Sequence, residues 1–408
     1  MQLSCAQLPR PERWRAPQSG ASPPAAPPAR ELPPRPPPAT TLTLLLAGSV
    51  LFAAGSARAQ RGGPARGAEG SLHIYADDDE VTVITPSASA WTPLSDTLAL
   101  DVATTVDVVT AASVDVVTQA SPYTVYEQRV EAGAGLAWTA GRLVGLSGRV
   151  VGSTENDYRS LHLSVGARLE TPDRNGSLDL AYTAAVDQVG RAGDPAFDRA
   201  RRGHRLTLTG TEVLGPRTYA DLVLDGEIAT GYQANPYRYV PILDAGGGSV
   251  SLAERVPGER HSGAALVRLR RAVSDRVYLH GDYRLYGDSW GIVSHTASAS
   301  GLVAVAGGRA TLGLTARGYT QGAAVFYRAE YSSDAAGVPA WRTRDRALGG
   351  MRTLSATVVA DVVLTDAPAD DAPHLVGALG LIRFTFHDFP PQARRDAVVA
   401  SAQVLVPF

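Results

Sequence analysis

The sequence has little cysteine, no lysine and few charges, and each shortage excludes a class of protein. Of its 408 residues one is a cysteine, Cys5, and every basic residue is an arginine. Only 19% of the residues are charged and the formal net charge is −2, so we expect no nucleic-acid partner. The 44% of hydrophobic residues is too high a share for a disordered chain.

Long apolar runs are missing as well, apart from a short one near the N-terminus. Residues 42–55 are apolar but too few to span a bilayer as a helix, and they precede Ala57-Arg58-Ala59, a small-x-small pattern that signal peptidase accepts. We therefore expect residues 1–59 to be a Pro-rich leader and signal peptide. Because Cys5 lies within it, the exported chain would have no thiol for a disulfide or a cysteine-ligated metal, and we expect no cofactor.

The remainder of the chain alternates between apolar and polar residues. Between residues 160 and 170, for example, Leu161, Leu163 and Val165 alternate with His162 and Ser164. This period of two predicts strands with one apolar and one wet face. About 14 segments of bilayer-crossing length follow one another, and they cover residues 97–108, 127–139, 142–153, 159–171, 176–188, 203–214, 218–230, 262–273, 276–287, 292–305, 309–322, 351–365, 374–387 and 396–408.

The connections alternate between short and long. Tight turns are expected at 139–142, 171–176, 214–218, 272–276 and 306–309, and most of the connections between them are longer, above all Gly231–His261 and Ala323–Gly350. Outer-membrane barrels have short periplasmic turns and longer outer loops. We therefore predict an all-β fold: a transmembrane antiparallel up-and-down β-barrel of about 14 strands over residues 97–408, after a periplasmic segment over 60–96.

The last predicted strand ends on an aromatic residue. Val398, Val404 and Val406 belong to an apolar row that finishes at Phe408. This row resembles the signal by which the barrel assembly machinery recognises outer-membrane proteins. The expected partners are outer-membrane lipid and that machinery, with room for an unknown periplasmic partner, and the expected location is the bacterial outer membrane.

Charged residues of both signs fall on the wet face of the predicted strands. Paired charges can line a hydrated lumen at much lower cost than isolated buried charges. Acidic residues of one strand precede basic residues of the next, so they form either a ladder of ion pairs or the two walls of a transverse field. The lumen-facing candidates are Asp101, Arg129, Glu131, Arg149, Arg168, Glu170, Asp179, Asp187, Arg205, Asp221, Asp225, Glu227, Arg268, Arg270, Asp282, Arg284, Arg317 and Asp361.

An acidic run and a duplicated phrase precede most of these strands. Asp77, Asp78 and Asp79 offer carboxylates to a hard cation such as Ca²⁺, but without the ligand spacing of an EF-hand, so a solvated turn is favoured. The phrase Val-Asp-Val-Val-Thr occurs at 106–110 and at 114–118. It forms either a plug or ligand segment within the lumen or a hydrogen-bonded turn, through Asp107, Thr110, Ser113, Asp115, Thr118 and Ser121.

A histidine and a carboxylate on one strand face raise the question of catalysis. His280 with Asp282, or His162, would suit a hydrolase that also has a serine nucleophile. The chain has no G-x-S-x-G, H-E-x-x-H or P-loop motif, so packing in the lumen is favoured and we do not expect an enzyme.

Three features together resemble a known family: the run from Tyr75 to Pro86, the duplicated phrase, and Glu127-x-Arg129-x-Glu131. They resemble the bacterial outer-membrane family called domain of unknown function 3570, over about Ser71 to Phe408. The resemblance implies an outer-membrane barrel without an assigned activity, and it carries no catalytic residue.

Three functions remain open from the sequence. Passage of small polar solutes or ions through the barrel is preferred, with the two long loops setting selectivity. The alternatives are a non-conducting structural or binding barrel plugged by residues 106–121 and, less favoured, an outer-membrane hydrolase. A soluble periplasmic β-sandwich is the structural alternative.

Overall fold

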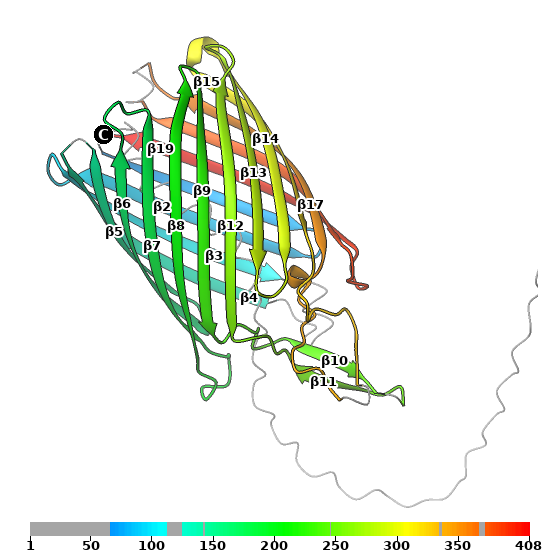
Figure 1. Cartoon of the computed structure of the whole chain (residues 1–408). Coiled ribbons are helices and arrows are strands. Elements are labelled where there is room, and N and C mark those ends of the chain that lie inside the picture. The colour runs from blue at the N-terminus through cyan, green and yellow to red at the C-terminus, as the bar shows by residue number, and fades with distance from the viewer. Residues whose placement is uncertain (1–65, 112–124, 142, 245, 334–336, 367–371) are drawn as a thin grey trace, which may run out of the picture. The chain divides into compact units, whose positions relative to one another are not determined.

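Sixteen antiparallel strands close into one barrel (Figure 1). The computed structural model describes residues 66–111, 125–141, 143–244, 246–333, 337–366 and 372–408, so the expected leader and its cleavage point lie outside the described residues. The barrel strands are β1 (Gly67–Asp77), β2 (Val81–Pro93), β3 (Leu98–Ala111), β4 (Val125–Ala140), β5 (Val144–Thr154), β6 (Tyr158–Glu170), β7 (Gly176–Val189), β8 (Arg199–Gly215), β9 (Thr218–Gly231), β12 (Glu259–Ala272), β13 (Val277–Asp288), β14 (Val293–Val305), β15 (Ala310–Gln321), β17 (Met351–Val363), β18 (His374–Phe386) and β19 (Arg394–Pro407).

The expected count of about 14 strands is corrected to sixteen. The two additional strands, β1 and β2, come from residues that the sequence placed before the barrel. They close the ring: β1 pairs with β2 on one side and with β19 on the other, with Gly67 opposite Pro407 and Asp77 opposite Ala397. Without them, β3 and β19 would present unpaired edges, which a spanning sheet cannot leave in lipid.

The two faces of the strands have opposite chemistry. Apolar side chains of one face are exposed, for example Leu163 and Leu314 at 57% each. The polar side chains that alternate with them along each strand are mostly half-buried. The Arg149 guanidinium reaches Asp101 across the intervening strand β4, as suits the concave side of a curved sheet, where side chains converge. The polar face therefore lines the interior and the apolar face lies outside, as in a transmembrane barrel.

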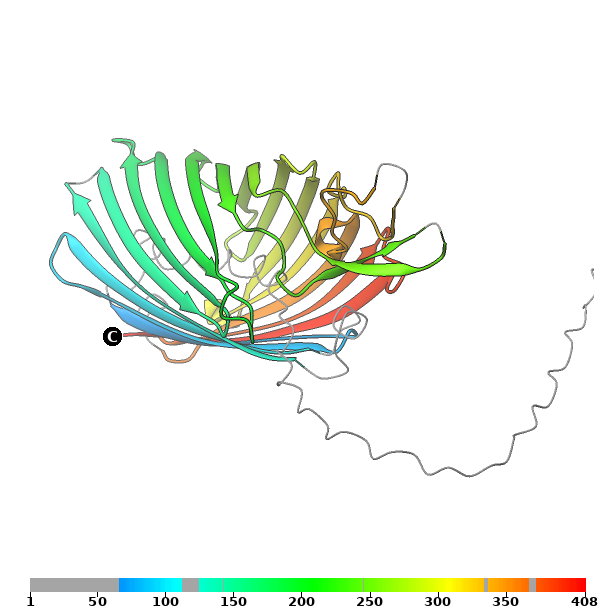
Figure 2. The ribbon, with the colours of Figure 1, turned by 90° about the horizontal axis from the view of Figure 1, so that it is seen from below.

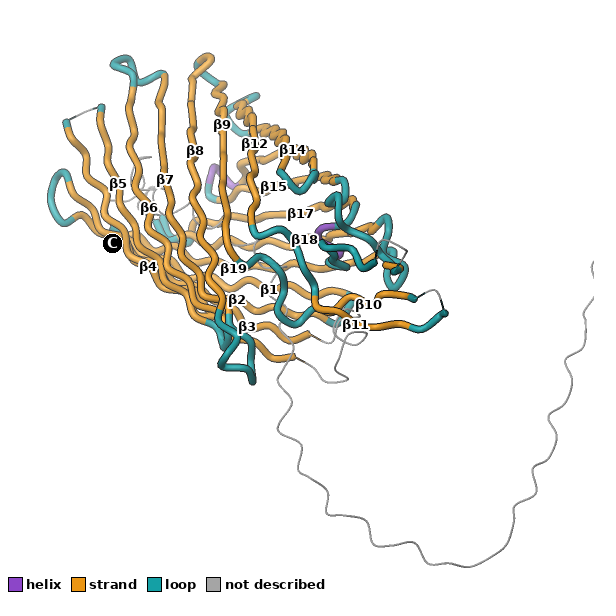
Figure 3. Tube along the Cα trace, turned by 60° about the horizontal axis from the view of Figure 1, so that its bottom comes forward, coloured by secondary structure: helices purple, strands orange, loops and turns teal. Residues whose placement is uncertain are grey.

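The two ends of the barrel differ as expected. Short turns join β2 to β3, β4 to β5, β6 to β7, β8 to β9, β12 to β13 and β14 to β15, and we call this end the turn end. Between β14 and β15 the turn is a 3₁₀ segment, η1 (Ala306–Gly308), in which Gly307 and Gly308 adopt positive φ angles of 69° and 92° that favour glycine. The other end, the loop end, carries most of the longer connections, although brief turns join β1 to β2 and β5 to β6 there, and Figure 3 shows long loops near β10 and β11.

The two longest loops fold into structure of their own, which the sequence analysis did not foresee. A three-stranded sheet in the order β11-β10-β16 joins the β9–β12 loop to the β15–β17 loop, and its β10–β11 hairpin is seen beside the barrel in Figure 2. Val240, Ile242 and Tyr331 form its buried core. The bounds are β10 (Tyr239–Leu243), β11 (Ser249–Ala253) and β16 (Tyr331–Ser332), and a 3₁₀ helix, η2 (Arg346–Leu348), follows in the second loop.

Specific contacts tie the loops to one another. The Tyr237 hydroxyl, in the β9–β12 loop, donates to Asp157 in the β5–β6 loop and accepts from the backbone N–H of Ala192 in the β7–β8 loop. Arg346 of η2 forms an ion pair of 2.6 Å with Asp79 in the β1–β2 turn. The loop end is therefore an interlocked rim. Among the described residues, no helix is long and apolar enough to cross a membrane.

Candidate functional site in the barrel lumen

One side of the lumen is lined by carboxylates that outnumber the arginines among them. We call this side, from β3 to β9, the paired wall. The arginines along this wall each have a carboxylate within ion-pair distance, except Arg199 at the loop end of β8, which lies over the Phe197 ring. The inward charged residues of the paired wall are Asp101, Asp107, Glu127, Arg129, Glu131, Arg149, Arg168, Glu170, Asp179, Asp187, Arg201, Arg205, Asp221, Asp225 and Glu227.

Strand register creates these pairs. Arg168 on β6 stands opposite Asp179 on β7, and its Nη1 lies 3.2 Å from an Asp179 carboxylate oxygen. Arg201 donates to the Asp187 carboxylate over 2.6 Å, and the Asp187 side chain is fully buried. Such a pair holds two strands together, and removing one partner would take away the closest opposite charge of the other.

One pair bridges a glycine. Asp101 on β3, Gly135 on β4 and Arg149 on β5 are successive register partners. A Cβ atom on Gly135 would lie 2.3 Å from Asp101 Oδ1 and 3.3 Å from an Arg149 guanidinium nitrogen. The glycine therefore makes room for the ion pair to pass over its strand.

The other side of the lumen, from β12 to β15, carries more arginines than carboxylates, and we call it the arginine wall. Arg270 contacts Asp282 at 2.5 Å, whereas Arg268 lies 3.9 Å from Asp221 of the paired wall. Asp225 pairs with Arg205 instead of with the β12 arginines. The inward charged residues here are Arg260, Arg268, Arg270, Asp282, Arg284, Asp288 and Arg317; the remaining predicted residue, Asp361, lies on β17 beside His374.

Arg284 and Arg317 differ from the arginines that form ion pairs in the lumen. In the described part of the chain, no carboxylate lies within 4.0 Å of either guanidinium group. Register explains this, because the partners of Arg284 are Leu266 and Thr296. Those of Arg317 are serines, Ser298 and Ser355. Each guanidinium instead stacks on a tyrosine two positions along its own strand.

The two walls adjoin where β9 pairs with β12, but their far parts face each other across the ring. In the closed strand order, β14 is the eighth strand from β4 in either direction. The unpaired arginines flank β14, while Glu127, Arg129 and Glu131 lie on β4. The sequence left open an ion-pair ladder or two opposed walls. The structure contains ion pairs along each wall and an excess of opposite sign between the walls.

Water reaches these side chains. The Arg205 side chain is 43% exposed, that of Glu227 32% and that of Asp282 28%, although all three point inward. Sixteen strands form a wider ring than the eight-stranded barrels that side chains can fill. The interior is therefore polar and accessible to solvent.

An acidic cluster at the loop end was not predicted from the sequence. Carboxylate oxygens of Glu127, Glu155 and Asp157 lie within 4.8 Å of one another, a spacing that could hold a metal ion. Burial, and then the charge of Glu127 and a hydrogen bond to it, raise the pKa of Glu155 to about 8. A shared proton therefore accounts for the closeness without an ion. The signal in the sequence was the pair of acidic residues around Asn156 in a brief turn.

The predicted acidic run forms the β1–β2 turn, and its carboxylates contact protein groups. Asp77 accepts hydrogen bonds from the backbone N–H groups of Asp79 and Val81. Asp78 accepts one from the backbone N–H of Asp396. Asp79 is buried rather than solvated, because Arg346 covers it.

The duplicated segment is described only in its first copy. Residues 106–111 continue β3, where Asp107 accepts a hydrogen bond of 2.6 Å from Thr85 and Thr110 donates to the carbonyl of Thr82. This part is barrel wall and not a plug. Ser113, Asp115, Thr118 and Ser121 lie outside the described residues.

The two histidines that the sequence singled out lie near carboxylates that other side chains already contact. Asp282 is engaged by Arg270 and by Ser298, whose hydroxyl lies 2.9 Å away, and in the described chain no hydrogen bond joins His280 to it. His162 lies 3.6 Å from Asp187, which Arg201 already binds.

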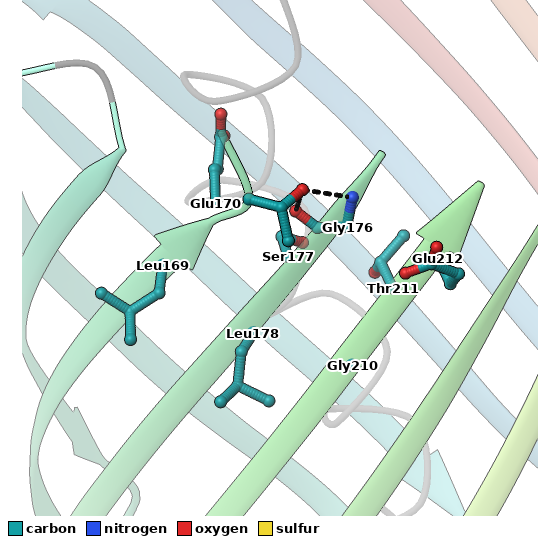
Figure 4. A pocket seen from close by; sticks show the side chains of 9 residues that line it. Leu169, Glu170, Gly176, Ser177, Leu178, Gly210, Thr211 and Glu212 are labelled. Atoms are coloured by element: carbon teal, nitrogen blue, oxygen red, sulfur yellow. Dashed lines mark hydrogen bonds between the residues drawn. The ribbon is translucent and has the colours of Figure 1, made fainter. Parts of the chain in front are cut away.

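A pocket of about 350 Å³ lies at the turn end of β6, β7 and β8 (Figure 4). Its lining includes Glu170, Thr171 and Ser177, and the Thr171 hydroxyl accepts a hydrogen bond from the backbone N–H of Gly176. No histidine or cysteine lines it, and its ionisable side chains are the carboxylates of Glu170 and Glu212.

Fold and lumen together define a transmembrane β-barrel with a polar interior. Residues 111–367, more than half of the chain, match the model of the family described as protein of unknown function DUF3570, and the chain belongs to that family. No curated protein matches the sequence.

Solved structures resemble the chain at low sequence identity. A bacterial polysaccharide outer membrane secretin has a TM-score of 0.46 at 8% identity and covers 84% of this chain and 98% of its own. The siderophore receptor PirA from Pseudomonas aeruginosa has 0.43 at 10%, over 83% of this chain and 62% of the receptor. A loop L8 deletion mutant of OmpT, an outer membrane protein of Vibrio cholerae, has 0.42 at 10%, over 83% and 98%. These likenesses concern the fold alone.

Proposed function

We propose that this barrel is a pore of the bacterial outer membrane through which small polar solutes or ions pass. The observation that carries the proposal is the solvent-accessible, charged lining of a closed sixteen-stranded ring. Barrels of 16 to 18 strands are wide enough for an aqueous channel. A lumen that only had to be filled would not need so many charged side chains.

The outer face supports the membrane location. Leucine and valine side chains are exposed along the outer face, and among them Leu224 and Leu314 lie on strands of opposite walls. Lipid would cover this surface, which would cause aggregation in water. The apolar row of β19 that ends near Phe408, exposed at 69%, is suited to recognition by the assembly machinery.

The contacts among the loops favour a pore that stays open over one that is opened and closed by loop movement. Because the rim is tied by Tyr237 and by the Arg346–Asp79 ion pair, we propose a constantly open pore whose loops set selectivity at the entrance. Large loop movements would have to separate the buried Arg346–Asp79 ion pair and the hydrogen bonds of Tyr237.

Planar-bilayer recording of the full chain tests the pore. Stable current steps that scale with salt concentration are expected, as is swelling of proteoliposomes in small sugars. A folded barrel that inserts but carries no current would identify the non-conducting alternative. Esterase or protease activity that is lost in the His280→Ala variant would support the hydrolase instead.

A further inference from the structure

We propose that Arg284 and Arg317 form a binding site for small oxyanions, the carboxylate or phosphate groups of solutes, on the arginine wall. The inference deepens the proposed pore function, on which it rests, by naming the class of solute. Its starting point is the pairing pattern of the lumen, in which these two inward arginines have no carboxylate partner in the described chain.

Stacking leaves the two guanidinium groups ready to bind. The guanidinium carbon of Arg284 lies 5.3 Å from the ring centroid of Tyr286, and that of Arg317 lies 5.7 Å from the ring centroid of Tyr319. A ring contact on the flat face leaves the N–H groups at the edge of the guanidinium available. That edge matches the spacing of two oxygens in a carboxylate or phosphate.

Strand register places hydroxyl groups beside the two arginines and brings the arginines to the same part of the wall. Thr296 on β14 is the register partner of both Arg284 and Tyr319. Arg317 lies two positions from Tyr319 on β15, so the two guanidinium groups lie at neighbouring heights of the wall. Like charges held together repel one another, and a bound anion relieves that repulsion.

A solute in the lumen can reach the site. Arg317 is an exposed residue even though it faces the lumen. Its neighbours on β15, Ala316 and Gly318, face outward. The paired wall differs, because there the guanidinium groups already bind carboxylates of the chain. An anion would have to displace those carboxylates, whereas at Arg284 and Arg317 it displaces only water.

Equilibrium binding to the full chain in detergent tests the site without requiring conduction. We expect saturable binding of inorganic phosphate or acetate by calorimetry, and at least tenfold weaker binding in Arg284→Gln/Arg317→Gln. The matched control, Arg168→Gln/Arg205→Gln, removes the same charge from the paired wall and should change affinity by less than about twofold. Thermal unfolding of each variant verifies folding, and the single Arg317→Gln variant, exposed in the lumen, serves if the double variant fails to fold.

Phosphate and acetate are compared because they represent the two kinds of group the site could bind. Binding of either anion supports the site, and the tighter of the two shows whether it prefers phosphate or carboxylate groups. Equal affinity in wild type and Arg284→Gln/Arg317→Gln, or no saturable binding to wild type, would overturn the proposal. Bilayer recording separates the two claims. Anion binding without current would contradict the pore proposal and support the binding site. Current without anion binding, and unaffected by either anion, would support the pore and contradict the binding site.

Discussion

Arginine occurs on both walls of the lumen, but its neighbours differ. On the paired wall, register places carboxylates beside Arg168 and Arg201, so their charges are used within the protein. On the arginine wall, the register partners of Arg317 are serines, and its charge remains available to the lumen. The comparison teaches that the role of an inward charge depends on what the neighbouring strand presents at the same height. Substitutions on the two walls should therefore have different effects.

The largest effect is expected at the buried end of the paired wall. Asp187→Ala leaves Arg201 without its closest carboxylate, in a place where the Asp187 side chain is fully buried. Breaking such a pair should lower the free energy of unfolding by about 3–5 kcal/mol. Urea unfolding in detergent micelles measures the loss. The control is Asp179→Ala, at a side chain 32% exposed, which should cost about 1 kcal/mol or less; equal losses would contradict the assignment of Asp187 as a structural partner.

A smaller loss is expected where the ion pair crosses β4. Gly135→Ala places a methyl group against Asp101 and Arg149, so the bridge must shift or break. Overpacking of this kind costs about 1–3 kcal/mol. Gly148→Ala on the neighbouring strand is the control, because a Cβ there meets no atom within 4 Å. The two variants unfolding at the same urea concentration would argue against a bridge over Gly135.

The acidic cluster at the loop end should make stability depend on pH. In the folded barrel the pKa of Glu155 is raised to about 8 from an ordinary value of 4.5. Its contribution is therefore fully present below about pH 4.5 and is lost as pH rises through about 8. Thermal unfolding of wild type and Glu155→Gln between pH 4 and 9 tests this, and the difference between the two should change in that window. A difference that stays constant with pH would exclude a protonated Glu155.

The smallest effect on stability is expected on the arginine wall. Arg317→Gln removes a charge without a carboxylate partner in the described chain, so the free energy of unfolding should change by about 0.5 kcal/mol or less. The same urea titration measures it. A loss as large as that of Asp187→Ala would show that Arg317 has a structural role and would remove the contrast between the walls.

The sequence predicted the barrel because one period of two runs through nearly every strand. Fourteen spans correspond to strands of the structure, and residues such as Leu163 and Arg168 fall on the faces that alternation assigns to them. Strands β1 and β2 were missed because the acidic turn at 77–80 and Pro86 interrupt the pattern. Alternation within a strand says nothing about which distant strand closes the ring, so the pairing of β1 with β19 needed coordinates.

The sequence predicted which charged residues face the lumen, but not which of them form ion pairs with one another. The acidic residues of β9 and the arginines of β12 were predicted to form either an ion-pair ladder or two opposed walls. Register places Asp225 opposite Thr207 and Ala264, and its arginine partner is Arg205 of β8. Whether Arg284 and Arg317 meet a carboxylate likewise depends on the residues that the neighbouring strands place opposite them, and the sequence does not give that register. The sheet in the long loops was overlooked because β10 and β11 have only five residues each.

The account depends on an outer surface in lipid and an inner surface in water, and thiol labelling measures both on one strand. With Cys5 replaced by serine, Thr315→Cys and the adjacent Leu314→Cys are placed in lipid vesicles and treated with a water-soluble maleimide. We predict rapid labelling at position 315 and protection at position 314. Equal labelling of both positions would show that water surrounds the strand, and protection at position 315 would show that the lumen is closed.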